Sequence, residues 1–368
     1  WIDNVTINQT IQIPLDSNKM NTPLIAGKPG NLRVFVGVTG NADGIKSTVR
    51  LEGTASSGNL TPIENEFSLR NTPKNSSEEF YHPVNFHLTS EYLQPGVSIK
   101  VTLDPKNNHN ETNENNNIYP STGSKNLIFL SKPSLKIKFI PVKSTGDNTA
   151  LKTDNETLTN LRTYLSSMYP NDNVSVSYTV PLQSNYTGTS ISIWQSVLDE
   201  VNTFRTLDKA SNGSENDIFY YGLWTGGKSS YTPGYVGLAY QPSSASSNSP
   251  LSGIGFVFPE VILSTTAHEI GHNHGLPHIK CADEYNDYGE TPASHDNNYP
   301  YNASPPGNGS ESTTGNRDDF GRIGKMGYDF RNGNYVSKTL YHDIMSYCGR
   351  TWISDYHYNK IHNFQTAL

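Results

Sequence analysis

Apolar and polar residues alternate along short segments in the first third of the chain. Every second residue is valine, isoleucine or leucine in the segments 32–38 and 97–103, and a less regular alternation surrounds Phe86 and Leu88. Because successive side chains of a β-strand point to opposite faces, this period predicts strands with one buried face. Glycine, proline and asparagine separate these segments, which is typical of an antiparallel β-sandwich.

We expect this β-sandwich to occupy residues 1–132. The segment 107–124 is rich in asparagine and lacks periodicity, so it predicts a long loop or linker. Residues 127–130 are expected to form the last strand, and residues 135–142 to begin a second domain, which places the boundary near Lys132. No cluster of titratable residues in the first domain suggests chemistry, so we interpret it as a structural or substrate-docking accessory domain.

The hydrophobic period changes after this boundary. Thr153 and Glu156 have the spacing of a capping box at the start of a helix. Two amphipathic helices are predicted by apolar residues at helical spacing: Leu158, Leu161, Leu165 and Met168, and then Trp194, Val197, Leu198, Val201 and Phe204. Strands are predicted at 174–180, 217–224, 235–240 and 253–258. Alternation of strands with helices implies an α/β domain over residues 133–368, with a mixed twisted sheet covered by helices.

Composition limits the possible functions. The chain has 368 residues, which suits two domains, and a formal net charge of -7. A negative net charge argues against nucleic acid or an anionic membrane as the main partner. No apolar run approaches the length of about 18 residues that a membrane helix needs. The chain begins with Trp1 and shows no signal peptide, which fits a processed, secreted protein.

The segment 267–278, Ala-His-Glu-Ile-Gly-His-Asn-His-Gly-Leu-Pro-His, carries the strongest chemical signal. His268 and His272 are four residues apart, so on a helix they lie on the same face. This spacing allows both imidazoles to reach one zinc ion at about 2.0–2.1 Å. Glu269 directly follows the first histidine and can reach a water at the metal without binding the metal itself, as a general base requires.

Gly275 and Pro277 indicate how a third histidine joins the site. Glycine readily adopts the left-handed conformation that ends a helix, and proline prevents the helix from continuing. The chain can then turn and bring His278 back to the metal. Three protein ligands leave a fourth position for water, which is the mark of a catalytic zinc site. Chance gives the extended pattern in fewer than about one in 10,000 chains of this length, so we do not interpret it as ordinary surface histidines.

The pattern His268-Glu269-x-x-His272-x-x-Gly275-x-x-His278 resembles the extended zinc motif of the metzincin endopeptidases. The resemblance covers roughly residues 135–368 and implies a metzincin-like catalytic domain that hydrolyses peptide bonds. In that family the ion activates a water, whose proton the glutamate takes and then delivers to the leaving nitrogen. The first domain is similar to accessory β domains of large bacterial secreted metalloproteases, some of which cut glycoproteins.

Two further segments resemble the same family. Residues 343–347, Asp-Ile-Met-Ser-Tyr, look like its methionine-containing turn, in which Met345 packs beneath the imidazoles. Tyr347 matches the astacin-like and serralysin-like branches better than the adamalysin-like (reprolysin-like) branch. It either binds zinc when the site is empty and supports the oxyanion during turnover, or only forms a wall of the pocket. The edge strand of the adamalysin-like branch, which would pair with an extended substrate, corresponds to Gly237, Leu238, Ala239 and Tyr240.

The two cysteines flank elements that the resemblance brings to one metal. Cys281 lies three residues after His278, and Cys348 lies three residues after Met345. In an exported chain we expect a disulfide between them, which would tie the third-ligand loop to the methionine turn. Two free thiols are the alternative.

The remaining polar residues near the motif are interpreted more simply. His274 is expected at the surface, and His342 with Asp343 is expected to form a polar turn rather than to support a ligand. The long polar segment 282–341 is expected to shape substrate specificity. Calcium binding is possible at three acidic residues in it, although solvated charges are the preferred interpretation: Asp283, Glu284 and Asp287.

The leading hypothesis is a secreted, monomeric zinc endopeptidase that acts on extracellular proteins, including glycoproteins or mucins. The alternative is an extracellular binding or adhesion protein in which zinc is structural and the fourth position is closed, for example by Tyr347. Glu269 argues against this alternative, because a structural zinc site needs no base.

Overall fold

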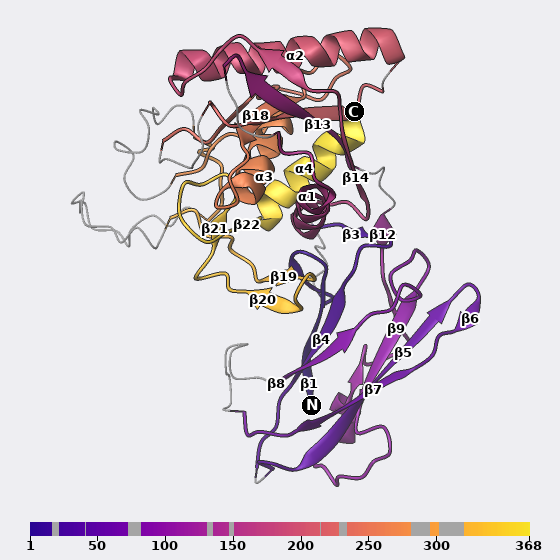
Figure 1. The fold of residues 1–368 in the computed structure, drawn as a ribbon. Coiled ribbons are helices and arrows are strands. Elements are labelled where there is room, and N and C mark those ends of the chain that lie inside the picture. Colours follow the sequence, from indigo (N-terminus) through magenta and orange to yellow (C-terminus); the bar gives the residue numbers. More distant parts are fainter. Residues whose placement is uncertain are drawn as a thin grey trace, which may run out of the picture. The chain divides into compact units, whose positions relative to one another are not determined.

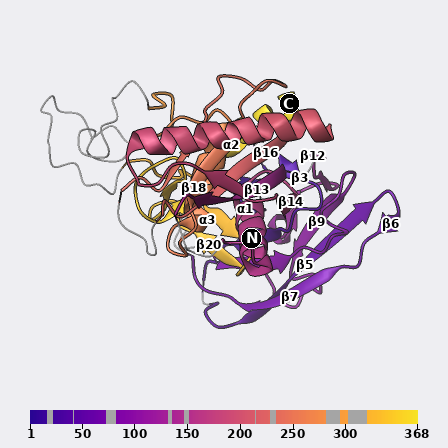
Figure 2. The same cartoon turned by 45° about the horizontal axis from the view of Figure 1, so that its top comes forward.

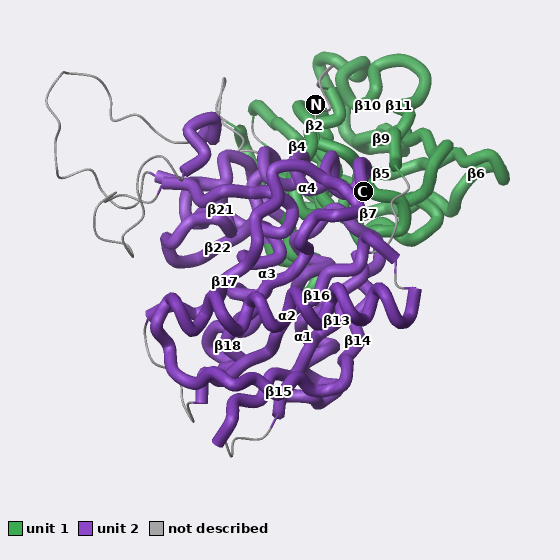
Figure 3. Tube along the Cα trace, turned by 90° about the horizontal axis from the view of Figure 1, so that it is seen from above, with its two compact units in different colours: residues 1–132, 328–334 green, residues 133–327, 335–368 purple. Residues whose placement is uncertain are grey.

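A computed structural model describes residues 1–16, 22–40, 42–72, 82–130, 135–146, 151–213, 215–227, 234–280, 295–301 and 320–368. The chain divides into two compact units, which Figure 3 colours separately. The first comprises Trp1–Lys132 and Tyr328–Asn334, and the second comprises Pro133–Gly327 and Tyr335–Leu368.

The first unit contains two sheets built from antiparallel neighbours. One has the order β2 (Gln12–Pro14), β1 (Ile2–Asn8), β4 (Asn31–Val36), β8 (His82–His87). The other has the order β10 (Ile118–Tyr119), β9 (Ser98–Leu103), β5 (Lys46–Ala55), β6 (Gly58–Asn59), with β7 (Ile63–Ser68) also on β5 and β11 (Lys125–Asn126) also on β9. In addition, β3 (Leu24–Ile25) pairs in parallel with β12 (Phe129–Leu130).

The alternating residues of both sheets share one apolar core. Val34 from β4, Leu51 from β5 and Val101 from β9 are fully buried in it, because the inward-facing positions of a strand recur every second residue. As its asparagine content predicts, the segment 107–124 is mostly loop, but it lies within the first unit rather than linking two domains. It holds a short 3-10 helix at Glu114–Asn116 and strand β10, which pairs with β9 inside this unit.

A segment from late in the chain also belongs to the first unit. Tyr328 N–H donates a hydrogen bond to Thr10 O at 2.9 Å, and Lys28 Nζ lies 5.5 Å from the centre of the Phe330 ring. This segment spans the end of β19 (Gly327–Asp329) and the start of β20 (Asn334–Val336). No pattern in the sequence predicted this return.

The second unit is built on a mixed sheet, as the alternation of strands and helices predicted. Its order is β14 (Val174–Tyr178), β13 (Leu135–Ser144), β16 (Ile218–Trp224), β18 (Ser252–Phe256), β17 (Gly237–Ala239), with β15 (Leu182–Ser184) also on β13. The pairs are parallel except for β17, which is antiparallel to β18. A further short parallel pair joins β21 (His342–Asp343) and β22 (Thr351–Trp352).

Helices cover both faces of this sheet. The helix α2 (Ile191–Asn212) lies on one face, and α1 (Asn155–Met168), α3 (Ile262–Asn273) and α4 (Asp355–Ala367) lie on the other (Figures 1 and 2). None of the helices in the described part of the chain combines the length and apolar character needed to span a bilayer.

Local chemistry explains where these helices begin and end. Asp154, rather than the expected Thr153, caps α1, because its Oδ1 accepts the Thr157 N–H at 2.7 Å. Helix α2 ends at Gly213 in the left-handed conformation, with φ of 60°. Trp194 of α2 meets Trp224 of β16 edge to face, with ring centres 4.9 Å apart, and this contact fastens the helix to the sheet.

Candidate metal centre

Three imidazoles from the motif converge at the end of α3. His268 and His272 lie one turn apart on the helix, and the chain turns at Gly275, whose φ is +77°. The turn brings His278 Nε2 to 3.0 Å from His268 Nε2 and 2.9 Å from His272 Nε2. The three residues form a group whose nitrogen atoms could hold a metal ion.

Backbone carbonyls set the protonation of two of these rings. His268 Nδ1 lies 2.6 Å from Ile344 O, and His272 Nδ1 lies 2.8 Å from Leu276 O. A carbonyl oxygen only accepts hydrogen bonds, so both Nδ1 atoms must donate, and in the neutral ring each Nε2 then carries a lone pair. Burial, followed by the neighbouring His268 and His278, holds the pKa of His272 well below its usual range and keeps that ring neutral.

These lone pairs fit a cation better than they fit one another. His278 Nε2 can donate at most one proton, yet two lone pairs point at it from 2.9 and 3.0 Å. A tetrahedral ion with bonds of 2.0–2.1 Å would hold its nitrogen ligands about 3.3 Å apart, close to the observed spacing. Three neutral imidazoles suit zinc and neighbouring divalent transition metals.

Two glycines of the motif allow close packing around the rings. A Cβ on Gly271 would lie 2.6 Å from Met345 Sδ, so the methionine fits against the helix only because this position has no side chain. A Cβ on Gly275 would lie 2.8 Å from Pro242 O, in addition to the strain of its positive φ. Met345 is fully buried and packs beneath the helix that carries the first two histidines.

Asp343 anchors the methionine turn to α4. Its Oδ1 accepts the Met345 N–H at 2.8 Å and His357 Nδ1–H at 2.7 Å, and its Oδ2 accepts the Ser354 N–H at 2.9 Å. Burial alone would raise the pKa of Asp343, but His357 and the hydrogen bonds from Ser354 and Met345 outweigh it and hold the pKa below its usual value.

The prediction of a mere polar turn at His342 and Asp343 is therefore wrong. Asp343 is fully buried, and it fixes the turn whose Ile344 carbonyl orients His268. His342 is also buried, and its Nδ1 donates to Gly349 O at 2.8 Å. Sequence spacing did not reveal this arrangement because two partners of Asp343, His357 and Ser354, belong to α4 and to its N-cap.

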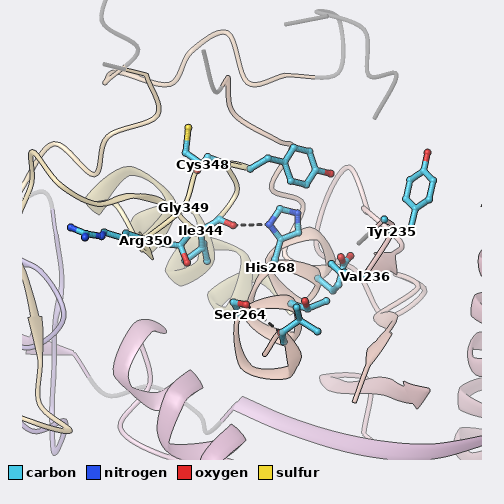
Figure 4. Close-up of a pocket in the computed structure, with 16 residues that line it drawn as sticks. Tyr235, Val236, Ser264, His268, Ile344, Cys348, Gly349 and Arg350 are labelled. Carbon is cyan, nitrogen blue, oxygen red and sulfur yellow. Dashed lines mark hydrogen bonds between the residues drawn. The ribbon is translucent and has the colours of Figure 1, made fainter. Parts of the chain in front are cut away.

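Glu269 lines the same cavity as His268 and lies against the edge strand. It is 6% exposed, and a Cβ on Gly237 would lie 2.4 Å from its Oε1 and 2.6 Å from Thr265 Cγ2, so a larger residue at that strand position would displace these side chains. A cavity of about 340 Å³ opens beside His268 and Glu269. Figure 4 shows it, with the His268 ring directed at the Ile344 carbonyl.

The cavity is bounded by the edge strand, the first turns of α3 and the methionine turn. Its lining includes Tyr235, Ser264, Thr265, Tyr347, Cys348 and Arg350. Tyr347 is 43% exposed, and its hydroxyl lies 2.9 Å from His278 Nε2. That hydroxyl therefore lies within hydrogen-bonding distance of one of the three imidazoles.

Strand β17 is the edge of the sheet, and within the described residues its side away from β18 carries no further strand. Val236 O accepts the Phe256 N–H at 2.9 Å, and the Tyr240 N–H donates to Ser252 O at 3.0 Å. Antiparallel pairing alternates, so the backbone groups of Gly237 and Ala239 point away from β18. Leu238 directs its backbone groups toward β18 instead.

Near the site, His274 differs from its predicted position, and Asp296 was not predicted at all. His274 is buried rather than at the surface, with 2% exposure, and its ring stacks on Phe219 with centres 4.7 Å apart. Burial lowers the pKa of His274 to about 4. No sequence motif predicted a role for Asp296. Its N–H donates a hydrogen bond to His278 O at 2.8 Å, and its Oδ2 accepts one from Lys360 of α4.

Several predicted residues lie outside the described part of the chain. Cys281 is among them, as are the candidate calcium ligands Asp283, Glu284 and Asp287. Cys348 is buried beside the cavity. The disulfide and the calcium site therefore stay predictions.

Comparisons with known proteins add little to this geometry. No protein-family profile matches the chain, and no curated protein matches its sequence. Among solved structures, it aligns with metalloproteinase-II from Bacteroides fragilis at 18% sequence identity and a TM-score of 0.28. The alignment covers 42% of this chain and 45% of the Bacteroides fragilis chain, so this chain spans less than half the length of that protein. A likeness this weak decides neither fold nor function, and the inference of function depends on the site itself.

Proposed function

We propose that this chain is a zinc-dependent endopeptidase of the metzincin type. One observation carries the proposal: Nε2 of His268 and Nε2 of His272 lie 3.0 and 2.9 Å from Nε2 of His278, with the first two rings held as acceptors. Glu269 lies next to them and against the edge strand. A structural metal site would have no use for a buried carboxylate aimed at an open cavity.

Each group of the site has a role in peptide hydrolysis. A bound zinc ion would supply Lewis acidity that polarises the scissile carbonyl and lowers the pKa of water. Glu269 takes the proton of the attacking water and later delivers it to the leaving nitrogen. The outward backbone groups of Gly237 and Ala239 pair with an extended substrate. The Tyr347 hydroxyl donates a hydrogen bond to the developing oxyanion.

The replacement Glu269→Gln tests this assignment. Because Glu269 is not a proposed ligand, we expect zinc content by elemental analysis to stay near one ion per chain. The amide keeps the volume of the side chain but cannot accept the proton of the water. Hydrolysis of casein or a mucin-type glycoprotein should fall at least about 100-fold. Mass spectrometry of the products should show cleaved peptide bonds with the parent enzyme. Unchanged hydrolysis by the variant would eliminate Glu269 as the base.

A second candidate is an extracellular binding protein in which the metal is structural. The position of the Tyr347 hydroxyl, 2.9 Å from His278 Nε2, favours it, because a phenolate there could close the fourth vertex. Stoichiometric zinc in a parent protein that cleaves none of the substrates would support this candidate over the peptidase.

The branch of the family, the accessory unit, the disulfide and the substrate class are inferred from the resemblance of the sequence to the metzincin endopeptidases. We infer an adamalysin-like catalytic unit with a Met-x-Tyr turn, a β-sandwich accessory unit, and a monomeric chain that is secreted. We also infer the Cys281–Cys348 disulfide, which suits an oxidising compartment. The class of substrate would be extracellular proteins, with glycoproteins or mucins to be compared against unglycosylated proteins by product analysis.

A further inference from the structure

Helix α3 presents two neighbouring rows of side chains. His268 and His272 form one row, which faces His278. Thr265, Glu269 and Asn273 are also spaced four residues apart and therefore form a second row beside the first. This second row faces the edge strand.

The first two members of this row fit against the start of β17. A Cβ on Gly237 would lie 2.6 Å from Thr265 Cγ2 and 2.4 Å from Glu269 Oε1. The edge strand thus approaches the helix directly beside the proposed base, and no side chain separates them.

The third member ties the other end of the strand. Asn273 is fully buried, and its Nδ2 donates hydrogen bonds of 2.8 Å to both Tyr240 O and Ser252 O. Ser252 O also accepts the Tyr240 N–H at 3.0 Å, as the last rung between β17 and β18. One amide group therefore joins the helix to both strands at the point where their ladder ends.

The chemistry of Asn273 suits this role better than simple packing. A fully buried position filled for packing alone favours an apolar side chain, because an unsatisfied polar atom costs free energy. Asn273 Oδ1 has no hydrogen-bond partner among the described residues, so the side chain bears that cost. Its two N–H bonds are the compensating gain.

We propose that Asn273 is a positioning residue that fixes the edge strand relative to the metal-binding helix and so sets the register of an extended substrate. This inference rests on the proposed peptidase function. A substrate that pairs with Gly237 and Ala239 is held by backbone groups alone, so a shift of the strand moves the scissile bond relative to Glu269. Loss of the tie therefore weakens the pairing with the substrate backbone, and the effect appears mainly in KM.

The variants Asn273→Leu and Asn273→Ala both remove the two N–H donors. Leucine nearly keeps the volume of the side chain, whereas alanine makes it smaller. Asn202→Ala is the matched control, because Asn202 Oδ1 accepts only the hydroxyl of Ser252, at 3.1 Å, and holds no strand backbone. Hydrogen exchange in zinc-loaded protein should become at least about tenfold faster at the amides of residues 236–240 in the Asn273 variants, and stay unchanged in Asn202→Ala.

Kinetics and inhibition separate substrate positioning from general damage. We expect KM for an extended peptide to rise about tenfold while kcat changes less than about threefold. The inhibition constant of a peptidyl hydroxamate should rise similarly, whereas that of acetohydroxamate, which contacts only the metal site, should not change. Asn273→Ala provides the test if the larger leucine disturbs folding.

Unchanged exchange and unchanged KM in folded Asn273 variants would overturn the inference, as would an equal effect of Asn202→Ala. A parent protein that binds zinc but hydrolyses nothing would overturn the proposed function instead. In that case the exchange measurement still decides whether Asn273 holds the edge strand.

Discussion

At the scale of single residues, the candidate site depends on which nitrogen of each histidine carries the proton. The motif supplies the imidazoles at the right spacing, but Ile344 O and Leu276 O decide that His268 and His272 present lone pairs to the metal position. One acceptor comes from the turn just after the helix, and the other from a segment 76 residues away. The sequence therefore predicted the ligands but not the groups that orient them.

The role of Tyr347 is testable at this scale. Tyr347→Phe removes only the hydroxyl that lies 2.9 Å from His278 Nε2. If the hydroxyl stabilises the oxyanion, kcat should fall about 10- to 100-fold, which corresponds to about 1.4–2.7 kcal/mol, with little change in KM. Tyr235→Phe, in the same cavity, is the control and should leave kcat within about twofold. A normal kcat in Tyr347→Phe would show that Tyr347 only lines the pocket.

At the scale of elements, the site is where four segments meet. Helix α3 brings the first two histidines and Glu269, the turn at Gly275 returns His278, β17 borders the cavity, and residues 343–347 support the rings from beneath. The N-cap residue of α3, Val261, makes no side-chain cap bond, so packing against β17, β18 and Met345 holds the helix in place.

The link between the methionine turn and α4 gives a prediction for stability and its pH dependence. Asp343→Asn leaves one of the three donors to Asp343 without an acceptor in a fully buried position. We expect the free energy of unfolding to fall by about 3 kcal/mol at pH 7. Urea titrations of the metal-free protein measure this difference directly. Asp172→Asn, at an exposed position, should change stability by less than about 0.5 kcal/mol.

The sign of the pH effect follows from the lowered pKa of Asp343. The folded protein keeps this carboxyl ionised to lower pH than the unfolded chain, whose ordinary value is 3.8. Its stabilising contribution is therefore complete above pH about 4 and is lost as the pH falls through the folded-state pKa. The difference between the parent and Asp343→Asn should shrink in the same range. A difference that stays constant down to pH 2 would contradict the assignment.

At the scale of the whole molecule, the chain forms two units with separate cores, and residues 328–334, which follow most of the second unit in the sequence, belong to the first unit. The second unit draws its site from residues between Gly237 and His357, which the sheet and α4 bring together. A ligand that binds this assembled site, and not the unfolded chain, stabilises the folded state.

Metal removal should therefore destabilise the protein. Zinc at about 1,000 times its dissociation constant would stabilise the folded state by about 4 kcal/mol, so chelation with EDTA should lower Tm by roughly 10 °C. Differential scanning calorimetry with and without zinc measures this shift. Glu269→Gln should keep the full shift, because the glutamate is not a ligand, and His272→Ala should lose it. An equal shift in His272→Ala would show that zinc binds elsewhere.

The sequence alone determined the features that depend on local order. The period of two predicted strands in the first unit, the period near 3.6 predicted α1 and α2, and the motif from His268 to His278 predicted three ligands and a turn at Gly275, because spacing along a strand or helix decides which side chains share a face. Local order was incomplete or misleading elsewhere: the asparagine-rich segment 107–124 is mostly loop but also supplies strand β10, and His274 is buried rather than at the surface.

Only the tertiary structure decided which distant groups meet at the site. The carbonyl of Ile344 on the ring of His268, the tie from Asp343 to His357, and the fit of Glu269 against Gly237 join residues that no local pattern relates. The physical reason is that a motif specifies directions within one element, whereas hydrogen bonds and close packing between elements depend on how the sheet, the turns and α4 fold together.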